Sequence, residues 1–412
     1  MFDIRQINLE NTGHLLNVPD SEIEGRLNRV RTFLKLKGLG ALVIVNRCAE
    51  GYTAWLTGRP MPDIPFNREG GYIVPADGTP VDVSSDTLVT EDYLRNYRKL
   101  DETVTVPAKN PLFRVAIGWY IPDIAECLSS GDARVGVVHL NYMTAALYDF
   151  LHDGIDGLEL VDVSQEMALL RAERTDFELE YARYSARSID RVFSTLPYLL
   201  RPGRLESEVA ADVRKRVYDL GAGGQDTGRM ADVQLISESQ TKAPEVEPIL
   251  YPGKRLECGD TVNVCLRAIS VNDLYAALGR LYVLGEAEAD TRTLWNHVIA
   301  AQDAAAGALC AGAKLEDAAS ALAAYCEKYG LKLCQENPLY GIGYVIGEIP
   351  VLYTTSGRAP LKAGMILAVA PTLSYPGGRH RYRCMDTYLI EEGGAVRLTQ
   401  TPRELICLDT IG

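Results

Sequence analysis

The chain has 412 residues, which is too long for one hydrophobic core of ordinary size and indicates two domains. Its net charge of −13 argues against nucleic acid or an anionic membrane surface as a partner, because both attract basic proteins. An apolar fraction of 47% with 24% charged residues is typical of a soluble protein.

The first residues are polar and contain no apolar core of signal-peptide length, and no apolar run approaches the roughly 20 residues of a membrane span. The nine cysteines are scattered without CxxC pairs, and their number is odd. This usage is typical of a reducing compartment, so we expect a cytoplasmic protein without a disulfide framework.

The first part of the chain alternates between helical and strand patterns. Residues 24–36 place apolar side chains on one helical face, and the apolar run 41–45 is typical of a buried strand. The alternation continues with predicted helices at 122–128 and 145–151 and predicted strands at 135–138 and 158–163. This pattern predicts an α/β domain over residues 1–160.

From Ser164 onward the pattern changes. One long helix is predicted over 178–200, ended by Pro202 and Gly203, and a second over 205–220. Later segments alternate between helices near 292–310 and 315–329 and strands at 232–236, 261–266, 368–373 and 387–391. We therefore expect an α+β domain with a curved antiparallel sheet over residues 161–412.

Three groups of glycine- and proline-rich segments carry a resemblance. They are 259–265 with 279–285, 339–343 with 347–350, and 361–365 leading through 370–371 to 383–386. In order and spacing they resemble the creatinase, prolidase and methionine aminopeptidase family, called pita-bread for its fold. The segments 167–171 and 175–180 resemble the start of that family's catalytic domain. The resemblance extends over about residues 20–412 and implies the pita-bread fold for the second domain.

The resemblance also implies where metal ligands would stand. The family's two-metal members place an Asp at Cys265, a second Asp at about Ala276 or Ala277, a His at Tyr340, and a Glu at both Ala370 and Met385. Divalent metals bind carboxylate oxygen and imidazole nitrogen, which Ala, Met and Tyr do not offer. The second His position is Gly347, and residues 243–252 contain no His. We therefore predict no metal and no cofactor.

One short segment is creatinase-like. Phe66-Asn67-Arg68 resembles a loop in which a Phe and an Arg reach into the neighbouring subunit's pocket, where the Arg holds the substrate carboxylate. A guanidinium suits this task because it forms two parallel charge-assisted hydrogen bonds. The resemblance thus implies a homodimer with Arg68 as carboxylate anchor. The alternative is an exposed arginine after a turn.

Several other side chains could act in a modified site. His380, in a Gly-Gly hairpin, could be a general acid or base near the former metal site, or a solvated histidine. Arg267, Arg381 and Arg383 would favour an anionic ligand where the family binds cations. Cys265 could be a nucleophile if a base or cation lowered its pKa, but buried cysteines are usually inert.

Tyrosines and glutamates complete the set of candidates. Tyr340 and Tyr344 could donate hydrogen bonds to a substrate, or fill the volume that the metals left. Glu247 stands where the family brings a His to the pocket and could act as a base. Glu348 and Asp386 would be structural partners rather than ligands.

The sequence leaves three readings of function open. The first is a metal-independent, creatinase-like enzyme that cleaves a C–N or related bond of a small carboxylate-bearing substrate, although no carboxylate–histidine pair is visible at suitable spacing. The second is a catalytically inactive pita-bread protein that binds a peptide, an anionic metabolite or a protein partner. The third is a metallopeptidase with shifted ligands, for which Asp232, Asp273 and Glu336 are too dispersed.

Overall fold

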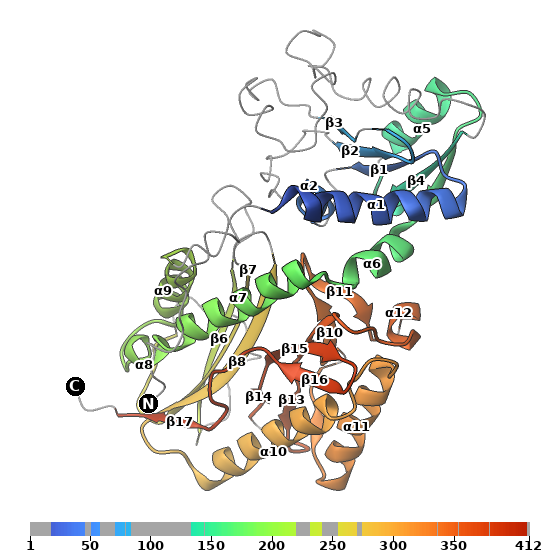
Figure 1. The fold of residues 1–412 in the computed structure, drawn as a ribbon. Coiled ribbons are helices and arrows are strands. Elements are labelled where there is room, and N and C mark those ends of the chain that lie inside the picture. The colour runs from blue at the N-terminus through green and yellow to red at the C-terminus, as the bar shows by residue number, and fades with distance from the viewer. Residues whose placement is uncertain are drawn as a thin grey trace. The chain divides into compact units, whose positions relative to one another are not determined.

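The computed structural model describes residues 18–45, 51–57, 71–78, 80–83, 133–143, 145–219, 231–240, 254–269, 274–335, 337–352, 354–378 and 380–409. These residues form two compact units, the first ending at Arg171 and the second beginning at Ala172 (Figure 1). The change of unit lies after the boundary near residue 160 that we expected from the sequence.

The N-terminal unit is built on one mixed sheet. Its strand order is β3-β2-β1-β4-β5, with β1 antiparallel to β2 and parallel to β4. The strands are β1 (Ala41–Val45), β2 (Gly71–Pro75), β3 (Val81–Val83), β4 (Arg134–Val138) and β5 (Glu159–Asp162). The helical segments are α1 (Asp20–Lys37), α2 (Tyr52–Thr57), η5 (Leu140–Tyr142), α5 (Ala145–Gly154) and α6 (Ser164–Ala172).

The C-terminal unit contains three sheets in its described part. Their orders are β17-β8-β7-β6, β11-β10-β12-β15-β16 and β14-β13-β9, and all pairs are antiparallel except β17 with β8. The strands are β6 (Asp232–Ser239), β7 (Asp260–Ile269), β8 (Tyr275–Leu284), β9 (Lys332–Leu333), β10 (Leu339–Ile342), β11 (Ile346–Val351), β12 (Ile366–Val369), β13 (Thr372–Ser374), β14 (Tyr382–Arg383), β15 (Asp386–Glu391), β16 (Gly394–Arg397) and β17 (Ile406–Leu408).

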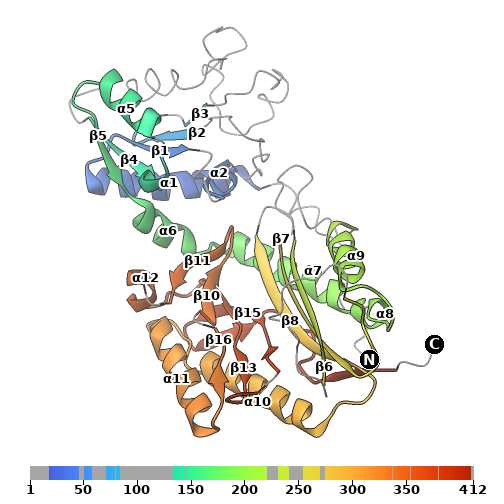
Figure 2. The ribbon, with the colours of Figure 1, turned by 180° about the vertical axis from the view of Figure 1, so that it is seen from behind.

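Helices cover these sheets. Helix α7 (Asp176–Phe193) lies along β7 and β8, and α9 (Glu206–Asp219) packs on β6 (Figure 2). Helices α10 (Ala289–Ala306) and α11 (Leu315–Lys328) pack on each other and on the other two sheets. The remaining helices are the short α8 (Leu196–Leu199) and α12 (Thr355–Arg358). Helix α7 begins with a capping box, in which the Thr175 side chain and that of Glu178 each accept from the other residue's backbone N–H.

Most predicted elements are confirmed, and so is the fold class: an α/β N-terminal domain and a C-terminal pita-bread domain with antiparallel sheets. Two predicted elements are wrong because each is interrupted. The helix expected over 178–200 ends at Phe193, since Pro197 lacks an N–H and its ring would clash with the carbonyl four residues earlier. The strand expected over 368–373 is two strands, separated by Ala370 and Pro371. The predicted helix 122–128 lies outside the described residues.

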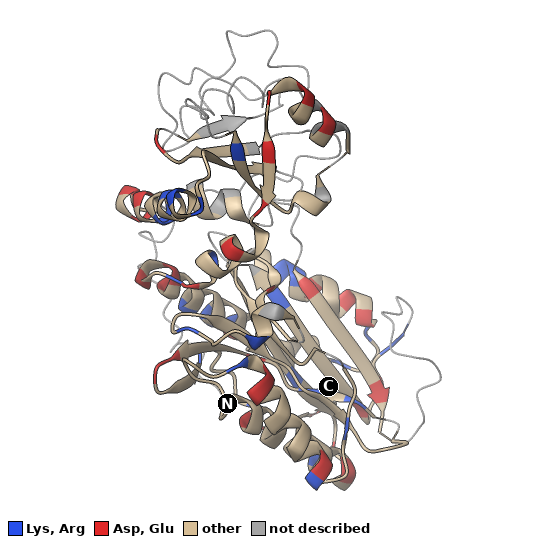
Figure 3. Ribbon diagram, turned by 90° about the vertical axis from the view of Figure 1, so that its right-hand side faces the viewer, with Lys and Arg blue, Asp and Glu red and all other residues tan. Residues whose placement is uncertain are grey.

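Acidic and basic residues occur along the helices and strands of each unit (Figure 3). Among the described residues, no helix has both the length and the apolar character needed to cross a membrane.

Candidate functional site

The five positions at which the family resemblance implied metal ligands lie together. Cys265 on β7, Ala277 on β8, Tyr340 on β10, Ala370 after β12, and Met385 all belong to one cluster of buried residues, which we call the central cluster. The sequence left Ala276 and Ala277 as alternatives. Ala276 points to the other face of the sheet and packs in a neighbouring core, as strand alternation requires, so Ala277 is the position that matches.

The side chains at these five positions do not fit a dinuclear metal centre. They present one thiol, one phenol, one thioether and two methyl groups, whereas such centres use carboxylates and imidazoles. Across the part of the chain that the structure describes, no group of three or more His, Cys, Asp or Glu side chains is arranged to hold a metal ion.

Cys265 is buried, and burial raises the pKa of its thiol. The guanidinium groups of Arg383 and Arg267 act in the opposite direction but do not offset this effect. A cysteine nucleophile needs a lowered pKa, so Cys265 remains a neutral thiol at neutral pH.

Tyr340 is held between a cation and a sulfur atom. Its hydroxyl donates to Sδ of Met385 at 3.6 Å, and Arg267 forms a hydrogen bond to it. Burial raises the pKa of Tyr340, which keeps the phenol protonated. Arg267 also forms an ion pair with Asp232, its partner on β6, so these three side chains form a connected polar group beside the central cluster.

Arg383 is fixed by three neighbours. Its backbone N–H donates to Oδ1 of Asn263 at 2.8 Å, its Nε to Oγ1 of Thr372 at 2.8 Å, and its Nη1 to Oε1 of Gln234 at 3.0 Å. Gln234 is the strand partner of Cys265, so the Arg383 guanidinium lies beside the central cluster. Arg381 is half-buried and immediately precedes β14.

Tyr344 and Glu348 belong to a buried ionic network instead. The Tyr344 hydroxyl donates to Oε1 of Glu178 at 3.0 Å, and the Arg174 guanidinium lies 5.1 Å from the Tyr344 ring centroid. Arg174 forms ion pairs with both Glu348 and Glu178. These side chains therefore join the start of α7 to β11.

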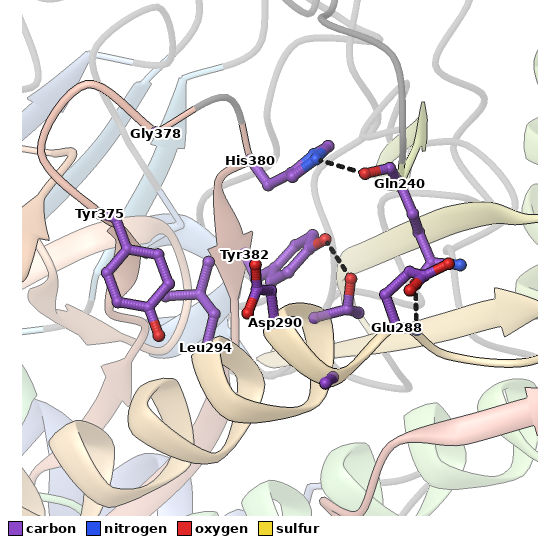
Figure 4. A pocket seen from close by; sticks show the side chains of 10 residues that line it. Gln240, Glu288, Asp290, Leu294, Tyr375, Gly378, His380 and Tyr382 are labelled. Atoms are coloured by element: carbon purple, nitrogen blue, oxygen red, sulfur yellow. Dashed lines mark hydrogen bonds between the residues drawn. The ribbon is translucent and has the colours of Figure 1, made fainter.

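His380 lies in a separate pocket of about 500 Å³ (Figure 4). Its Nδ1 is 3.3 Å from Oε2 of Glu238, and its Nε2 is 3.1 Å from the backbone oxygen of Gln240. Glu238 pairs with Thr261, four residues before Cys265 on β7, which corresponds to roughly 13 Å along an extended strand. The structure thus gives His380 a carboxylate partner but does not bring it to the central cluster.

Arg280 is a buried charge that the sequence analysis missed. Its guanidinium donates to both carboxylate oxygens of Asp386, at 2.7 and 3.2 Å, and to the carbonyls of Thr401, Pro402 and Met385. The signal in the sequence was an arginine on the same strand face as the apolar Leu278 and Tyr282. Phe66, Arg68 and Glu247 lie outside the described residues.

Comparison with known proteins agrees with this architecture. The model of metallopeptidase family M24 matches residues 180–392, just over half of the chain. A probable dipeptidase PepE from Mycobacterium tuberculosis is 26% identical over 67% of this chain and 74% of its own length. An Xaa-Pro dipeptidase from Pyrococcus furiosus is 29% identical over 70% and 85%, and a creatinase from a Bacillus species 24% over 66% and 67%.

Solved structures share the fold. The dipeptidase PepE from Mycobacterium ulcerans has a TM-score of 0.73 at 23% identity, with 95% of this chain and all of that chain covered. The N-terminal domain of the FACT complex subunit SPT16 from chickpea has a TM-score of 0.67 at 14% identity, with 94% and 98% covered. Because the family model matches more than half of the chain and the five ligand positions lie in one cluster, this chain belongs to metallopeptidase family M24.

Proposed function

We propose that this chain is an M24-family hydrolase that acts on a small, peptide-like carboxylate without a dinuclear metal centre. The observation that supports it most directly is the central cluster: the five ligand positions come together, but none carries a carboxylate or an imidazole. Relatives described as dipeptidases and Xaa-Pro dipeptidases support a substrate of peptide-like size. The relative described as a creatinase supports a small carboxylate as the more specific substrate class.

The charge beside the central cluster supports an anionic ligand. The positive charges of Arg267 and Arg383 both lower the pKa of Cys265 and of Tyr340. Among the described residues beside these arginines, the carboxylate that opposes their charge is Asp232. Guanidinium groups bind carboxylates with two charge-assisted hydrogen bonds. We propose that Arg383 and Arg267 receive the ligand carboxylate, together with Arg68, which lies outside the described residues and would come from the second subunit of a homodimer.

Tyr340 is the proposed hydrogen-bond donor to an oxyanion. Its phenol keeps its proton because burial raises its pKa, and its present acceptor is the thioether of Met385. A thioether is a weak acceptor, so a negatively charged oxygen would replace it readily. Because Cys265 stays protonated and His380 lies at the other end of β6, Glu247 is the proposed base.

A second candidate function is binding without catalysis. It is favoured by the contact between Tyr340 and Met385, two of the five ligand positions, whose side chains are buried against each other. The same fold occurs in a chain described as a subunit of the FACT complex, which supports a role in an assembly.

The first experiment combines metal analysis with measurements of turnover. We expect the purified chain to contain less than one divalent ion per chain and to hydrolyse members of a dipeptide panel at a rate that a chelator does not change. Tyr340→Phe should lower kcat by about 10²–10³, the cost of removing one oxyanion donor, while KM changes little. One or two tightly bound ions per chain would refute the proposal. Binding without turnover of any dipeptide would select the second candidate.

A variant with five substitutions tests whether the five ligand positions form one site. Cys265→Asp, Ala277→Asp, Tyr340→His, Ala370→Glu and Met385→Glu together should create a site whose thermal midpoint rises on addition of Mn²⁺, because a metal that binds only the folded state stabilises it. Wild type is the matched control and should not respond. An unresponsive variant that is folded by circular dichroism would show that these positions do not form one site.

A further inference from the structure

The pocket that contains His380 is a second feature of the C-terminal unit and does not depend on the central cluster. It is formed where the end of β6, the start of α10 and the segment before β14 meet, and it has a volume of about 500 Å³ (Figure 4). That volume is within the range of pockets that hold small organic molecules. The reaction proposed above uses none of its side chains.

The carboxylates of the pocket are available to a ligand. Glu288 and Asp290 both line it, both are exposed, and neither forms an ion pair with another described residue. Acidic residues at a helix start also stabilise the helix dipole. However, Glu288 is the N-cap of α10 and its side chain makes no capping hydrogen bond. The carboxylate is therefore not used by the helix for capping.

Aromatic rings form a further part of the wall. Tyr375 and Tyr382 line the pocket, and the His380 ring is stacked on Tyr382 with ring centroids 6.0 Å apart and an interplanar angle of 11°. The Tyr382 hydroxyl lies 3.3 Å from Oγ1 of Thr291, and burial raises the pKa of this phenol, so the ring stays neutral. The face of a tyrosine ring attracts a cation that lies within about 6 Å of the ring centroid.

The charge balance points in the same direction. His380 and Glu238 face each other, so the charge of a protonated His380 is balanced within the pair. The two carboxylates of Glu288 and Asp290 then determine the sign of the pocket. A metal ion is a poor match, because no group of three or more acidic, His or Cys side chains in the described chain is arranged to hold one.

We propose that this pocket binds a small organic cation, a primary ammonium or guanidinium group on an apolar body, with Glu288 and Asp290 as its anionic partners and Tyr375 and Tyr382 beside its apolar part. Two independent features carry the inference: carboxylates without an ion pair, and an aromatic wall in one concave site. The proposal holds whether or not the chain hydrolyses peptides.

The test uses three probes of one size and different charge on the full chain: benzylamine, benzyl alcohol and benzoate, followed by isothermal titration calorimetry at pH 7.5. Benzylamine should bind in the millimolar range or tighter, and at least about tenfold more tightly than the other two, which corresponds to about 1.4 kcal/mol. Asp290→Asn and Glu288→Gln should each weaken benzylamine binding, and the double variant should abolish it. Tyr375→Leu should weaken it without changing the preference for the cation.

Glu286→Gln is the matched control. It removes an exposed carboxylate two residues before Glu288 that does not line the pocket, and it should leave binding unchanged. Equal binding of benzyl alcohol, no binding of benzylamine, or wild-type affinity in the double variant would each overturn the proposal. Because Glu286, Glu288 and Asp290 are exposed and lie just before or at the start of α10, circular dichroism should show a folded chain in each of these carboxylate variants.

Discussion

At the scale of single residues, the buried pair of Arg280 and Asp386 has the largest consequence. Both side chains are inaccessible to solvent, and the Arg280 guanidinium is held by two carboxylate oxygens and several backbone carbonyls. Asp386 also accepts a hydrogen bond from Thr399 at 2.7 Å. The pair joins β8, β15 and the segment after β16, so it stabilises the side of the central cluster formed by Met385.

We predict that Asp386→Ala lowers the free energy of unfolding by about 3–5 kcal/mol, because it leaves the Arg280 charge buried without a partner. Urea unfolding followed by circular dichroism measures this. The control is Arg358→Met at the Arg358–Glu316 pair, where the arginine is 70% exposed and the loss should be far smaller. Equal losses in the two variants would contradict the structural role of Arg280.

Charge at the central cluster is also decided at this scale. Cys265 and Tyr340 are both neutral because burial raises the pKa of each, and the nearby arginines reduce but do not reverse the effect. In an active thiol site the pKa of the cysteine is lowered, whereas that of Cys265 is raised. Tyr340 needs its proton in order to donate a hydrogen bond, so it is the better candidate for chemistry.

At the scale of elements, Gly279 explains how two sheets meet. It pairs with Met385 through two backbone hydrogen bonds, of 2.8 and 3.2 Å, which connect β8 to the residue before β15. A Cβ added at Gly279 would lie 2.8 Å from Sγ of Cys265 and 3.0 Å from Cβ of Met385. A glycine is needed here because of close approach, not because of an unusual φ.

We predict that Gly279→Ala destabilises the fold by about 1–3 kcal/mol, the usual cost of overpacking a core. Since the closest atom is the Cys265 sulfur, Cys265→Ser should leave the clash in place, and Cys265→Gly should recover part of the loss in the double variant. Gly393→Ala, where an added Cβ meets nothing within 4 Å, is the control. The readout is the unfolding free energy of each variant in a double-mutant cycle.

At the scale of the whole molecule, Asp190 couples stability to pH. It lies on α7 and accepts hydrogen bonds from the backbone N–H groups of Gln400 and Thr401 and from the Thr401 hydroxyl, so it connects the helix to the C-terminal segment. Burial raises its pKa above the ordinary value of 3.8, and these hydrogen bonds only partly oppose the shift. The folded state therefore holds this proton to a higher pH than the unfolded state does.

We predict that the stability contributed by this proton is fully present below about pH 3.8 and is lost as the pH rises through the higher pKa of the folded state. The unfolding free energy of wild type minus that of Asp190→Asn, measured from pH 3.5 upward, should fall with rising pH, and only through this window. Taking the difference between the two unfolding free energies cancels the contribution of the other carboxylates, which titrate in both proteins. A constant difference across the range would contradict the raised pKa.

The amino-acid sequence determined much of the fold and one chemical fact about the site. Helical and strand periodicity is local, so elements such as α1, β1, α9 and β7 could be predicted from their own residues. The motif order identified the pita-bread domain, and residue types alone showed that Cys265, Ala370 and Met385 cannot serve as the family's carboxylates. The end of α7 before Pro197 is also a local effect, because a proline inside a helix removes one of its hydrogen bonds.

The tertiary structure decided which groups face one another. Only the strand register separates Ala277 from Ala276 and pairs Arg267 with Asp232, because a shift of one residue would exchange the two faces of β7 and β8. The partners of Arg280 and His380, Asp386 and Glu238, are 106 and 142 residues distant in sequence. Such contacts depend on how whole sheets pack, and no local pattern of side chains encodes them.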